Sequence, residues 1–276
     1  MKILVTGAKG QLGYDVMRVL KEHNIDYLGT DIEQLDITKE NDVFDYVKKY
    51  QPSVIIHCAA YTAVDKAEEN QELCYKINVL GTRYLVKSAQ AIDAKFVYIS
   101  TDYVFNGEGQ IPFTIHDKPE PVNYYGKTKY LGELEVLNNL SKSYIIRISW
   151  VFGINGHNFI KTMLKLSETR DILTVVSDQI GSPTYTLDLA YAIYDLINSD
   201  AYGIHHITNE GYCSWNEFAK EIFRQSNKNI IVNDILTKDY PTAAKRPLNS
   251  RMEKNSIKLR PWQEALDHFL KEYNHD

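Results

Sequence analysis

Residues 2–13 read KILVTGAKGQLG, and the order of residue types in this stretch decides the fold. The apolar run from Ile3 to Val5 is typical of a strand that is buried on both faces, as in a parallel sheet. A loop of the form G-x-x-G-x-x-G follows at once, and apolar residues at helical spacing follow the loop. Strand, glycine loop and helix in this order predict the dinucleotide-binding start of a βαβ unit. The alternative interpretation is a glycine-rich turn that binds no ligand.

The glycines Gly7, Gly10 and Gly13 would allow a tight turn and a close approach of backbone N–H groups to a pyrophosphate. Asp31 follows 18 residues after Gly13, at the end of a second predicted strand over residues 25–30. A carboxylate at this place can accept hydrogen bonds from the adenosine ribose. It would favour NAD over NADP because it repels a 2′-phosphate. An ordinary aspartate at a strand end remains the alternative.

Strand-like runs alternate with helical patterns through the first half of the chain. Besides 2–6, four runs read as strands: 25–30, 53–57, 96–100 and 144–148. This alternation predicts an α/β fold of the Rossmann type, with a doubly wound parallel sheet. Past residue 150 the alternation is less regular. We therefore expect an NAD(P)-binding domain over 1–150 and a smaller C-terminal α/β substrate-binding region over 151–276, helix-rich and interleaved with the first.

Several candidate residues fall at the carboxyl ends of these strands, the edge where open α/β sheets bind ligands. Ala59 and Ala60 follow the third strand, and their small side chains would let a cofactor lie across the sheet edge. Thr101 follows the fourth strand. Trp150 follows the fifth, where it could form a wall of a substrate site or simply pack in the core. His57 also ends a strand, but nothing in the sequence pairs with it, so a structural role is favoured.

Tyr125 and Lys129 are four residues apart in a segment that reads as a helix from Asn123, so they would share one face of it. A lysine ammonium near a phenol favours the phenolate, and we expect it to lower the pKa of Tyr125. Tyr125 could then donate or accept a proton near neutral pH. Thr101 could offer its hydroxyl to the same reacting oxygen. A Y-x-x-x-K match alone is weak, because both residue types are common on exposed helix faces.

Four other positions have open interpretations. Asn78 and Gly81 lie inside a predicted helical stretch that ends near Asp93, which suggests close packing or a side chain that serves a neighbouring loop. Asp36 is either a helix cap or a contact to the adenine amino group. Arg246 lies in a turn-rich segment and is a candidate for gripping a diphosphate, with a solvated surface arginine as the alternative.

The bulk properties narrow the class of protein. The chain has 276 residues, a formal charge of −5 and a pI of about 5.9, so nothing favours nucleic acid or an anionic membrane surface as a partner. Three widely spaced cysteines favour free thiols over a disulfide framework or a zinc site. The sequence shows neither a leader peptide nor a membrane span, and we expect a soluble cytoplasmic protein.

The chain resembles the extended short-chain dehydrogenase/reductase family, and within it the dTDP-4-dehydrorhamnose reductase family. The resemblance spans nearly the whole chain. It rests on five motifs: VTGAKGQLG at 5–13, AAYTAVDKAE at 59–68, STDYVF at 100–105, YGKTK at 125–129 and RPLNS at 246–250. The STDYVF motif is far more specific than the glycines.

The resemblance implies a role for each matching residue. Tyr125 would protonate the sugar O4 while NADH or NADPH delivers hydride to C4, Lys129 would hold the nicotinamide ribose and tune Tyr125, and Thr101 would bind the reacting oxygen. Residues implied to contact the cofactor are Gly7, Gly10, Gln11, Leu12, Gly13, Asp31, Asp36, Ile37, Ala59, Ala60, Tyr61 and Thr62, besides Tyr125 and Lys129. Residues expected to line the substrate site are Val64, Thr101, Asp102, Tyr103 and Trp150, with Arg246 as the diphosphate candidate.

The implied substrate is dTDP-4-dehydro-6-deoxy-L-mannose, which would be reduced at C4. The enzyme is expected to be a monomer or a homodimer. Two alternatives stay open: a reductase or epimerase of another nucleotide-sugar, and a non-catalytic regulatory subunit of the methionine adenosyltransferase type. Some members of the family hold magnesium through glutamates at a dimer interface. Asp15 and Asp188 lie near the expected places, but neither is a glutamate, so magnesium stays possible without support from the expected glutamates, and we assign no metal ligands.

Overall fold

A six-stranded parallel sheet forms the centre of the molecule, whose computed structural model describes residues 1–255 and 257–274. The strand order is β10-β5-β4-β3-β1-β2, and each neighbouring pair is parallel. The strands are β1 (Lys2–Thr6), β2 (Asp26–Thr30), β3 (Val54–His57), β4 (Lys95–Thr101), β5 (Ser143–Ile148) and β10 (Gly203–His206). The predicted Rossmann-type sheet is confirmed, and its sixth strand, β10, comes from beyond residue 150.

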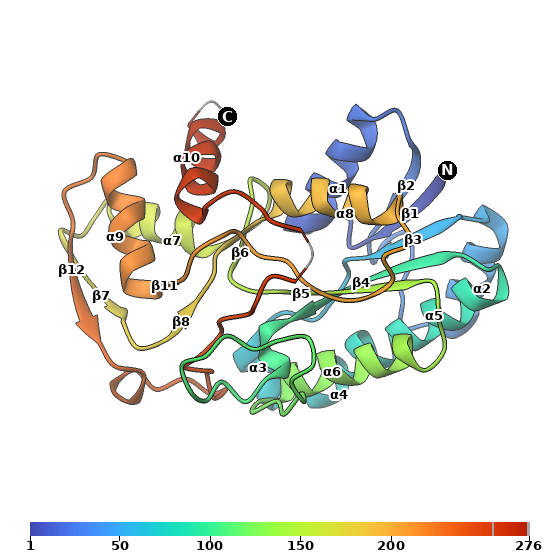
Figure 1. Ribbon diagram of the computed structural model, residues 1–276, viewed down its shortest axis with the longest axis horizontal. Helices are drawn as coiled ribbons and strands as arrows, with labels where there is room; N and C mark the ends of the chain where they lie inside the picture. Colours follow the sequence, from blue (N-terminus) through green and yellow to red (C-terminus); the bar gives the residue numbers. More distant parts are fainter. Residues whose placement is uncertain (256, 275–276) are drawn as a thin grey trace.

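Helices cover both faces of the sheet (Figure 1). One face carries α1 (Gln11–Glu22) and α8 (Thr186–Ile197), and the other carries α2 (Glu40–Tyr50), α5 (Thr82–Ala91) and α6 (Tyr124–Leu137). Successive strand residues point to opposite faces. Ile3 and Val5 of β1 therefore join the hydrophobic cluster under α1, whereas Leu4 joins the cluster under α2 and α5. This is the doubly wound arrangement that continuous apolar strands predict.

The predicted long helix that ends near Asp93 is broken into pieces. It consists of α3 (Val64–Glu69), α4 (Gln71–Tyr75), a π-helical turn η1 (Lys76–Gly81) and α5. Asn78 in the π-turn bonds to the backbone of Tyr61, with its Oδ1 accepting from the amide at 2.8 Å and its Nδ2 donating to the carbonyl at 3.2 Å. A Cβ on Gly81 would lie 2.8 Å from Cδ1 of Ile37. Both predicted reasons for polar and small residues in this stretch, a loop contact and close packing, are present.

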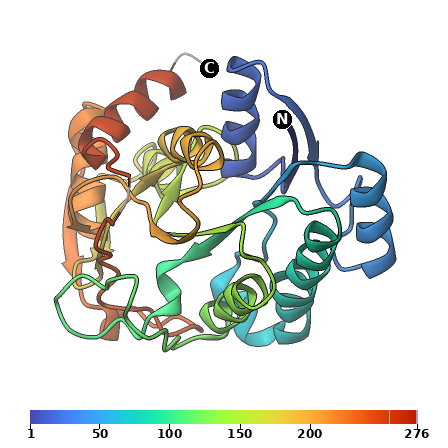
Figure 2. The same cartoon turned by 45° about the vertical axis from the view of Figure 1, so that its right-hand side comes forward.

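The remaining elements form a smaller lobe beside the carboxyl edge of the sheet (Figure 2). Its helices are α7 (Phe159–Leu166), α9 (Trp215–Gln225) and α10 (Trp262–Tyr273). Three two-stranded pairs join them: β6 (Val151–Phe152) with β9 (Thr184–Tyr185), β7 (Ile172–Val176) with β12 (Ile231–Ile235), and β8 (Ile180–Gly181) with β11 (Cys213–Ser214). Short 3₁₀ turns lie at η2 (Asp102–Val104) and η3 (Thr237–Asp239).

The two parts of the chain are interleaved through residues 186–206. In this segment α8 packs against α1, and β10 then pairs with β5 at the end of the main sheet. One hydrophobic cluster also runs without a break from β1 and α1 through α8 to α9 and α10. A domain division near residue 150 stays a prediction.

Among the helices that the structure describes in residues 1–255 and 257–274, none combines the length and the apolar composition that a membrane span requires.

Candidate active site

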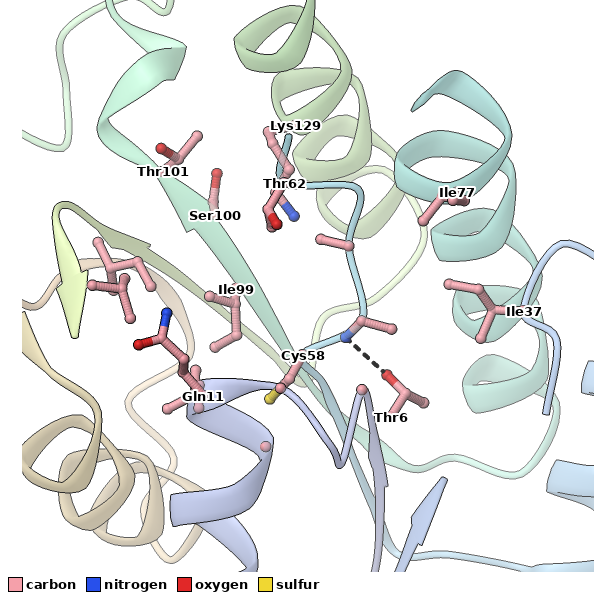
Figure 3. A pocket seen from close by; sticks show the side chains of 18 of the residues that line it. Thr6, Gln11, Ile37, Cys58, Thr62, Ile77, Ile99, Ser100, Thr101 and Lys129 are labelled. Atoms are coloured by element: carbon pink, nitrogen blue, oxygen red, sulfur yellow. Dashed lines mark hydrogen bonds between the residues drawn. The ribbon is translucent and has the colours of Figure 1, made fainter. Parts of the chain in front are cut away.

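A pocket of about 710 Å³ lies at the carboxyl edge of the sheet. It has the size of a small-molecule site. Its lining includes the three candidate catalytic residues, Thr101, Tyr125 and Lys129. Figure 3 shows Ser100 and Thr101 coming from β4 and Lys129 coming from α6. The predicted cofactor contacts that line it are Gly7, Gly10, Gln11, Leu12, Gly13, Asp31, Asp36, Ile37, Ala59, Ala60 and Thr62, and the predicted substrate contacts are Val64, Asp102, Tyr103 and Trp150.

The glycine loop is packed too tightly for side chains. Gly7 has a φ of +66°, and a Cβ there would lie 2.6 Å from the backbone nitrogen of Ala59. A Cβ on Gly13 would lie 2.2 Å from the carbonyl oxygen of Gly7. Among the described residues, no side chain caps α1 at Gly10, so its first amides are available to an anion. The loop therefore fits a dinucleotide pyrophosphate.

Asp31 is fixed at the other end of this loop. Its Oδ2 accepts a hydrogen bond from the backbone amide of Lys9 at 3.1 Å, and its Oδ1 accepts from the amide of Ile32 at 2.8 Å. The ammonium of Lys9 pairs with Glu33 at 2.9 Å, and both side chains are exposed. Asp31, the carboxylate expected to bind the adenosine ribose, therefore lines the pocket. Lys9 and Glu33 lie beside it.

The loop after β3 is held by Thr6, which the sequence did not mark as a site residue, together with His57 and Asn78. The hydroxyl of Thr6 lies 2.7 Å from Nδ1 of His57 and accepts from the amide of Ala59 at 3.4 Å (Figure 3). Tyr61, a predicted cofactor contact, does not line the pocket, and its backbone is bonded to the side chain of Asn78. Leu73 and Ile77 form part of the apolar wall of the pocket. Their spacing of four residues in a helical pattern is the sequence feature from which they could have been predicted.

Close packing of α6 against η2 brings Tyr125 and Lys129 to the pocket. Asn123 caps the helix, with its side chain accepting from the amide of Gly126 at 2.8 Å. A Cβ on Gly126 would lie 2.1 Å from the carbonyl oxygen of Tyr103, so only glycine lets the helix approach this closely. The rings of Tyr103 and Tyr125 meet edge to face with centroids 5.7 Å apart. The glycine in the YGKTK motif thus has a packing reason.

The pKa of Tyr125 differs from the expectation. Burial of the phenol raises its pKa above the ordinary value, the nearby Asp102 carboxylate raises it further, and the Thr101 hydroxyl acts in the opposite direction. The prediction that Lys129 lowers the pKa of Tyr125 is wrong for the protein without bound ligands. The ammonium of Lys129 instead lies over the ring of Tyr98, 4.2 Å from its centroid. In this arrangement Tyr125 holds its proton at neutral pH and can act as an acid.

Lys129 is itself strongly perturbed. Burial lowers its pKa to about 7, although Glu133 on the same helix acts to raise it. The side chain is almost fully buried at 3% exposure, and it lines the pocket. A lysine in such a place titrates near neutral pH, which is typical of functional sites.

Asp102 follows Thr101 at the pocket wall. The Thr101 hydroxyl donates to Oδ1 of Asp102 at 2.9 Å and accepts from the backbone amide of Tyr103 at 3.2 Å. Burial raises the pKa of Asp102 to about 6. Its Oδ2 is buried and has no hydrogen-bond partner among the residues that the structure places. A buried oxygen without a partner at a pocket wall is suited to receive a hydroxyl from a ligand.

Trp150 stands at the pocket in a strained backbone conformation, with a φ of +49°. Such a conformation is rare for a bulky residue and marks functional sites. Its ring stacks on Trp215 at the start of α9, with centroids 3.7 Å apart and planes 14° apart. Gly181 on β8 lies against the same ring, and a Cβ on this glycine would lie 2.8 Å from the indole of Trp150. Trp215 was not identified from the sequence, because nothing there shows that the start of α9 reaches Trp150.

Arg246 does not line the pocket. One guanidinium nitrogen, Nη2, pairs with Asp65 at the start of α3, and the backbone amide of Ala244 donates to the same carboxylate at 3.0 Å. The other nitrogen, Nη1, is buried and lacks a hydrogen-bond partner in the described part of the chain. The diphosphate role predicted for Arg246 stays a prediction.

His57 has a structural role, and the three cysteines form no disulfide. His57 is buried, its Nε2 lies 3.1 Å from the Thr82 hydroxyl, and burial together with the charge of Lys129 lowers its pKa to about 3. The cysteines Cys58, Cys74 and Cys213 are all free thiols. The favoured structural role of His57 is therefore supported, and it stays neutral at physiological pH.

The two acids weighed as magnesium ligands are paired with arginines. Asp15 binds Arg18 at 2.8 Å and the Thr186 hydroxyl at 2.5 Å, and Asp188 binds Arg260 at 2.7 Å. Over residues 1–255 and 257–274, no group of three or more His, Cys, Asp or Glu side chains could hold a metal ion. These acids do not fit a magnesium site, because each already faces a positive charge.

A family model described as the RmlD substrate binding domain matches residues 1–275. The chain belongs to this family. A curated relative in the family, the dTDP-4-dehydrorhamnose reductase of Aggregatibacter actinomycetemcomitans, is 41% identical and is aligned over 96% of this chain and 97% of its own length. The resemblance seen in the sequence motifs is therefore confirmed.

Solved structures agree with this assignment to the RmlD family. A crystal structure of dTDP-4-dehydrorhamnose reductase from Bacillus anthracis, in complex with NADP, matches with a TM-score of 0.96 and 42% identity over 98% of this chain and 99% of that one. A more distant relative carries a different name, dTDP-4-keto-6-deoxy-D-glucose reductase of Streptomyces niveus. It is 37% identical over 80% of this chain and 77% of its own length.

Proposed function

We propose that this protein is an NAD(P)H-dependent reductase that converts the C4 ketone of dTDP-4-dehydrorhamnose to the alcohol, giving dTDP-L-rhamnose. The observation that carries the proposal is one pocket lined by Thr101, Tyr125 and Lys129 together with the glycine loop. The family, and relatives named for this reaction over nearly the full length of the chain, support the substrate.

The bound nicotinamide supplies the hydride for this chemistry. The amides at the start of α1 would bind its pyrophosphate, and Asp31 would accept from the adenosine ribose. Lys129 would hold the nicotinamide ribose. Tyr125 would donate its proton to the sugar O4, and Thr101 would bind the same oxygen. Burial keeps Tyr125 protonated until a negative charge develops on that oxygen, which then draws the proton away.

The test removes the proposed acid without changing its ring. Tyr125→Phe should lower kcat about 10²–10⁴-fold while NADPH still binds, because a positioned general acid contributes roughly that much. Tyr124→Phe removes a phenol from the neighbouring position on α6, outside the pocket, and should stay near wild-type activity. Unchanged turnover in Tyr125→Phe would refute the proposal for this residue.

A second candidate is reduction of the D-sugar epimer, which the name of the Streptomyces niveus relative suggests. Supplying dTDP-4-dehydrorhamnose and dTDP-4-keto-6-deoxy-D-glucose separately, and comparing kcat/KM, decides between the two. We expect the first sugar to be reduced far faster. Faster reduction of the second would reassign the substrate and leave the roles of Tyr125 and Lys129 unchanged.

We further infer that the protein acts as a monomer or homodimer in the cytoplasm. Three free thiols and the need for reduced nicotinamide support this location. Sedimentation of the purified chain with and without magnesium measures the oligomeric state. We expect no effect of magnesium, because Arg18 and Arg260 already neutralise the two candidate acids.

A further inference from the structure

A fully buried ion pair lies behind the candidate active site. Glu133 on α6 and Arg147 on β5 have side-chain exposures of 0% and 2%. The guanidinium binds both carboxylate oxygens, with Nε to Oε1 at 2.9 Å and Nη2 to Oε2 at 2.7 Å. Ser100 on β4 also donates to Oε1, at 2.5 Å. Such a bidentate, hydrogen-bonded pair is geometrically well defined.

This pair connects the helix that carries Tyr125 to both strands beneath it. Ser100 and Arg147 are partners in the β4–β5 register, and Ser100 directly precedes Thr101. Glu133 lies four residues after Lys129 and eight after Tyr125, so the three side chains follow one another along one face of α6. The carboxylate therefore fixes the position of this face against the strand that delivers Thr101.

Two neighbouring contacts fix the same face. The hydroxyl of Tyr98 on β4 donates to the carbonyl oxygen of Lys129 at 3.2 Å. A Cβ on Gly132 would lie 2.1 Å from that hydroxyl, so the helix lies as close to β4 as a glycine allows. These contacts set the distance of α6 from the strand, and the Glu133 carboxylate adds a charge to the same interface.

We propose that Glu133 is a positioning residue for the reduction: held by Ser100 and Arg147, it aligns Tyr125 and Lys129 with Thr101 and supplies the negative charge that keeps the Lys129 amine in its ammonium form. The proposal rests on the function proposed above, because it assigns the alignment and charge that this reaction needs. Nothing in the sequence motifs alone requires a buried acid at this place.

The groups around Lys129 support the role of this charge. Besides Glu133 on α6, the amine is faced by Cys74 on α4, by Tyr98 on β4, and by His57 and Cys58 at the end of β3. Burial raises the pKa of the Tyr98 phenol and of both thiols, that of Cys58 to about 12, and His57 is neutral because its pKa is about 3. The Glu133 carboxylate is thus the charge among these neighbours that favours the ammonium.

Arg147 compensates the buried charge of Glu133, because its guanidinium binds both carboxylate oxygens. Its Nη1 also lies 3.4 Å from Nε2 of His206, whose Nδ1 lies 3.2 Å from the carbonyl oxygen of Glu253. Burial lowers the pKa of His206 to about 3, with the charge of Arg147 adding to the effect. His206 therefore accepts from Arg147 as a neutral ring and does not compete for Glu133.

The experiment compares three variants with the wild type. Glu133→Gln keeps the shape of the side chain and removes its charge. The double variant E133L/R147M replaces the whole pair by apolar side chains, which buried pairs often tolerate. Glu135→Gln is the matched control, because it removes the same charge two residues further along α6, where the carboxylate pairs with Arg83 at 2.6 Å.

The decisive measurement is the pH profile of kcat/KM. Removal of the Glu133 charge should make Lys129 lose its proton at lower pH, so the alkaline limb of the profile should move down by about one unit in Glu133→Gln. The limb should move down by less in E133L/R147M, because this variant also removes the positive charge of Arg147. Activity of Glu133→Gln at pH 7 should fall about fivefold, because the protonated fraction of a group with a pKa of about 7 falls from about one half to about one eleventh when its pKa drops by one unit. Glu135→Gln should keep the wild-type limb. A merely structural role would lower activity equally at every pH and leave the limb in place.

A limb that does not move in either Glu133 variant, or moves as far in Glu135→Gln, would overturn the proposal. If the wild type reduces no sugar, the proposed function fails separately, and NMR titration of lysine labelled at its ε-carbon still decides the inference. The resonance of Lys129, assigned by its loss in Lys129→Met, should titrate at lower pH in Glu133→Gln. Titration at the wild-type pH would contradict the role of the charge.

Discussion

At the scale of single residues, Lys129 shows a conflict between function and stability. Its folded pKa of about 7 lies below the ordinary lysine value of 10.5 because the side chain is buried. Since the unfolded chain binds this proton more tightly, the buried ammonium costs stability. The cost is fully present below about pH 7 and disappears as the pH rises toward the unfolded value.

Replacement of the ammonium should therefore stabilise the protein while it removes activity. We expect Lys129→Met to raise the free energy of unfolding by roughly 2–4 kcal/mol near pH 6, with a smaller gain near pH 9. Urea unfolding at both pH values measures the difference. Lys127→Met, at an exposed position on the same helix, serves as the control. A variant that is less stable than wild type near pH 6 would contradict the assigned cost of burial.

Residue spacing predicted which side chains share the pocket but not their ionisation. Tyr125 and Lys129 lie at the pocket as their spacing of four on a helix required. The pKa of Tyr125 could not be predicted, because burial by residues distant in sequence outweighs the neighbouring ammonium. The ion pair of Arg246 with Asp65 could not be predicted either, because the two residues are distant in sequence and the local sequence carries no signal of their pairing.

At the scale of elements, the close contact between α6 and η2 determines where Tyr125 stands. Gly126 lies inside a helix, where alanine would ordinarily be preferred. Here a Cβ would meet the backbone oxygen of Tyr103 at 2.1 Å, and backbone cannot rotate away as a side chain can. The steric cost should outweigh the gain in helix propensity.

Gly126→Ala should therefore destabilise the protein by about 1–3 kcal/mol, the usual range for overpacking. It should also reduce activity, because Thr101 and Tyr103 lie on the other side of the contact. Urea unfolding and the reductase assay measure both effects. Lys127→Ala, the exposed neighbour on the same helix, should leave both unchanged. Stabilisation of Gly126→Ala would show that the helix has room to move away.

Element boundaries were predictable where the signal is local. Asn123 caps α6 as expected, and the glycine loop starts α1. The π-turn at Lys76–Gly81 was not predicted, because its cause is tertiary: Asn78 bonds to the loop after β3 and to the hydroxyl of Thr128 at 3.0 Å. Polar residues inside the helical pattern were a correct sign of such contacts, but they did not show the helix would break.

At the scale of the whole molecule, the lobe and the main sheet share one hydrophobic cluster. The sixth strand, β10, could not be assigned from the sequence, because its short run gives no sign that it returns to β5. Trp150 and Trp215 stack between the two parts and report on their contact. A shared core of this kind favours cooperative unfolding.

We accordingly expect one unfolding transition in urea. Tryptophan fluorescence reports the stack between Trp150 and Trp215 together with the buried Trp262 of α10, and far-ultraviolet circular dichroism reports the helices of both parts. The two curves should coincide if the parts unfold together. Two separate transitions, with fluorescence lost first, would instead support independent domains on either side of residue 150.

The central claim is that hydride reaches C4 of the sugar while Tyr125 supplies the proton at O4. NADPH carrying deuterium at the transferred position of the nicotinamide, mixed with dTDP-4-dehydrorhamnose and the wild-type protein, tests it when the product is examined by NMR. We predict deuterium bound to C4 of dTDP-L-rhamnose, and about 10²–10⁴-fold slower labelling with Tyr125→Phe. Deuterium at another carbon, or equal labelling by the two proteins, would contradict the account.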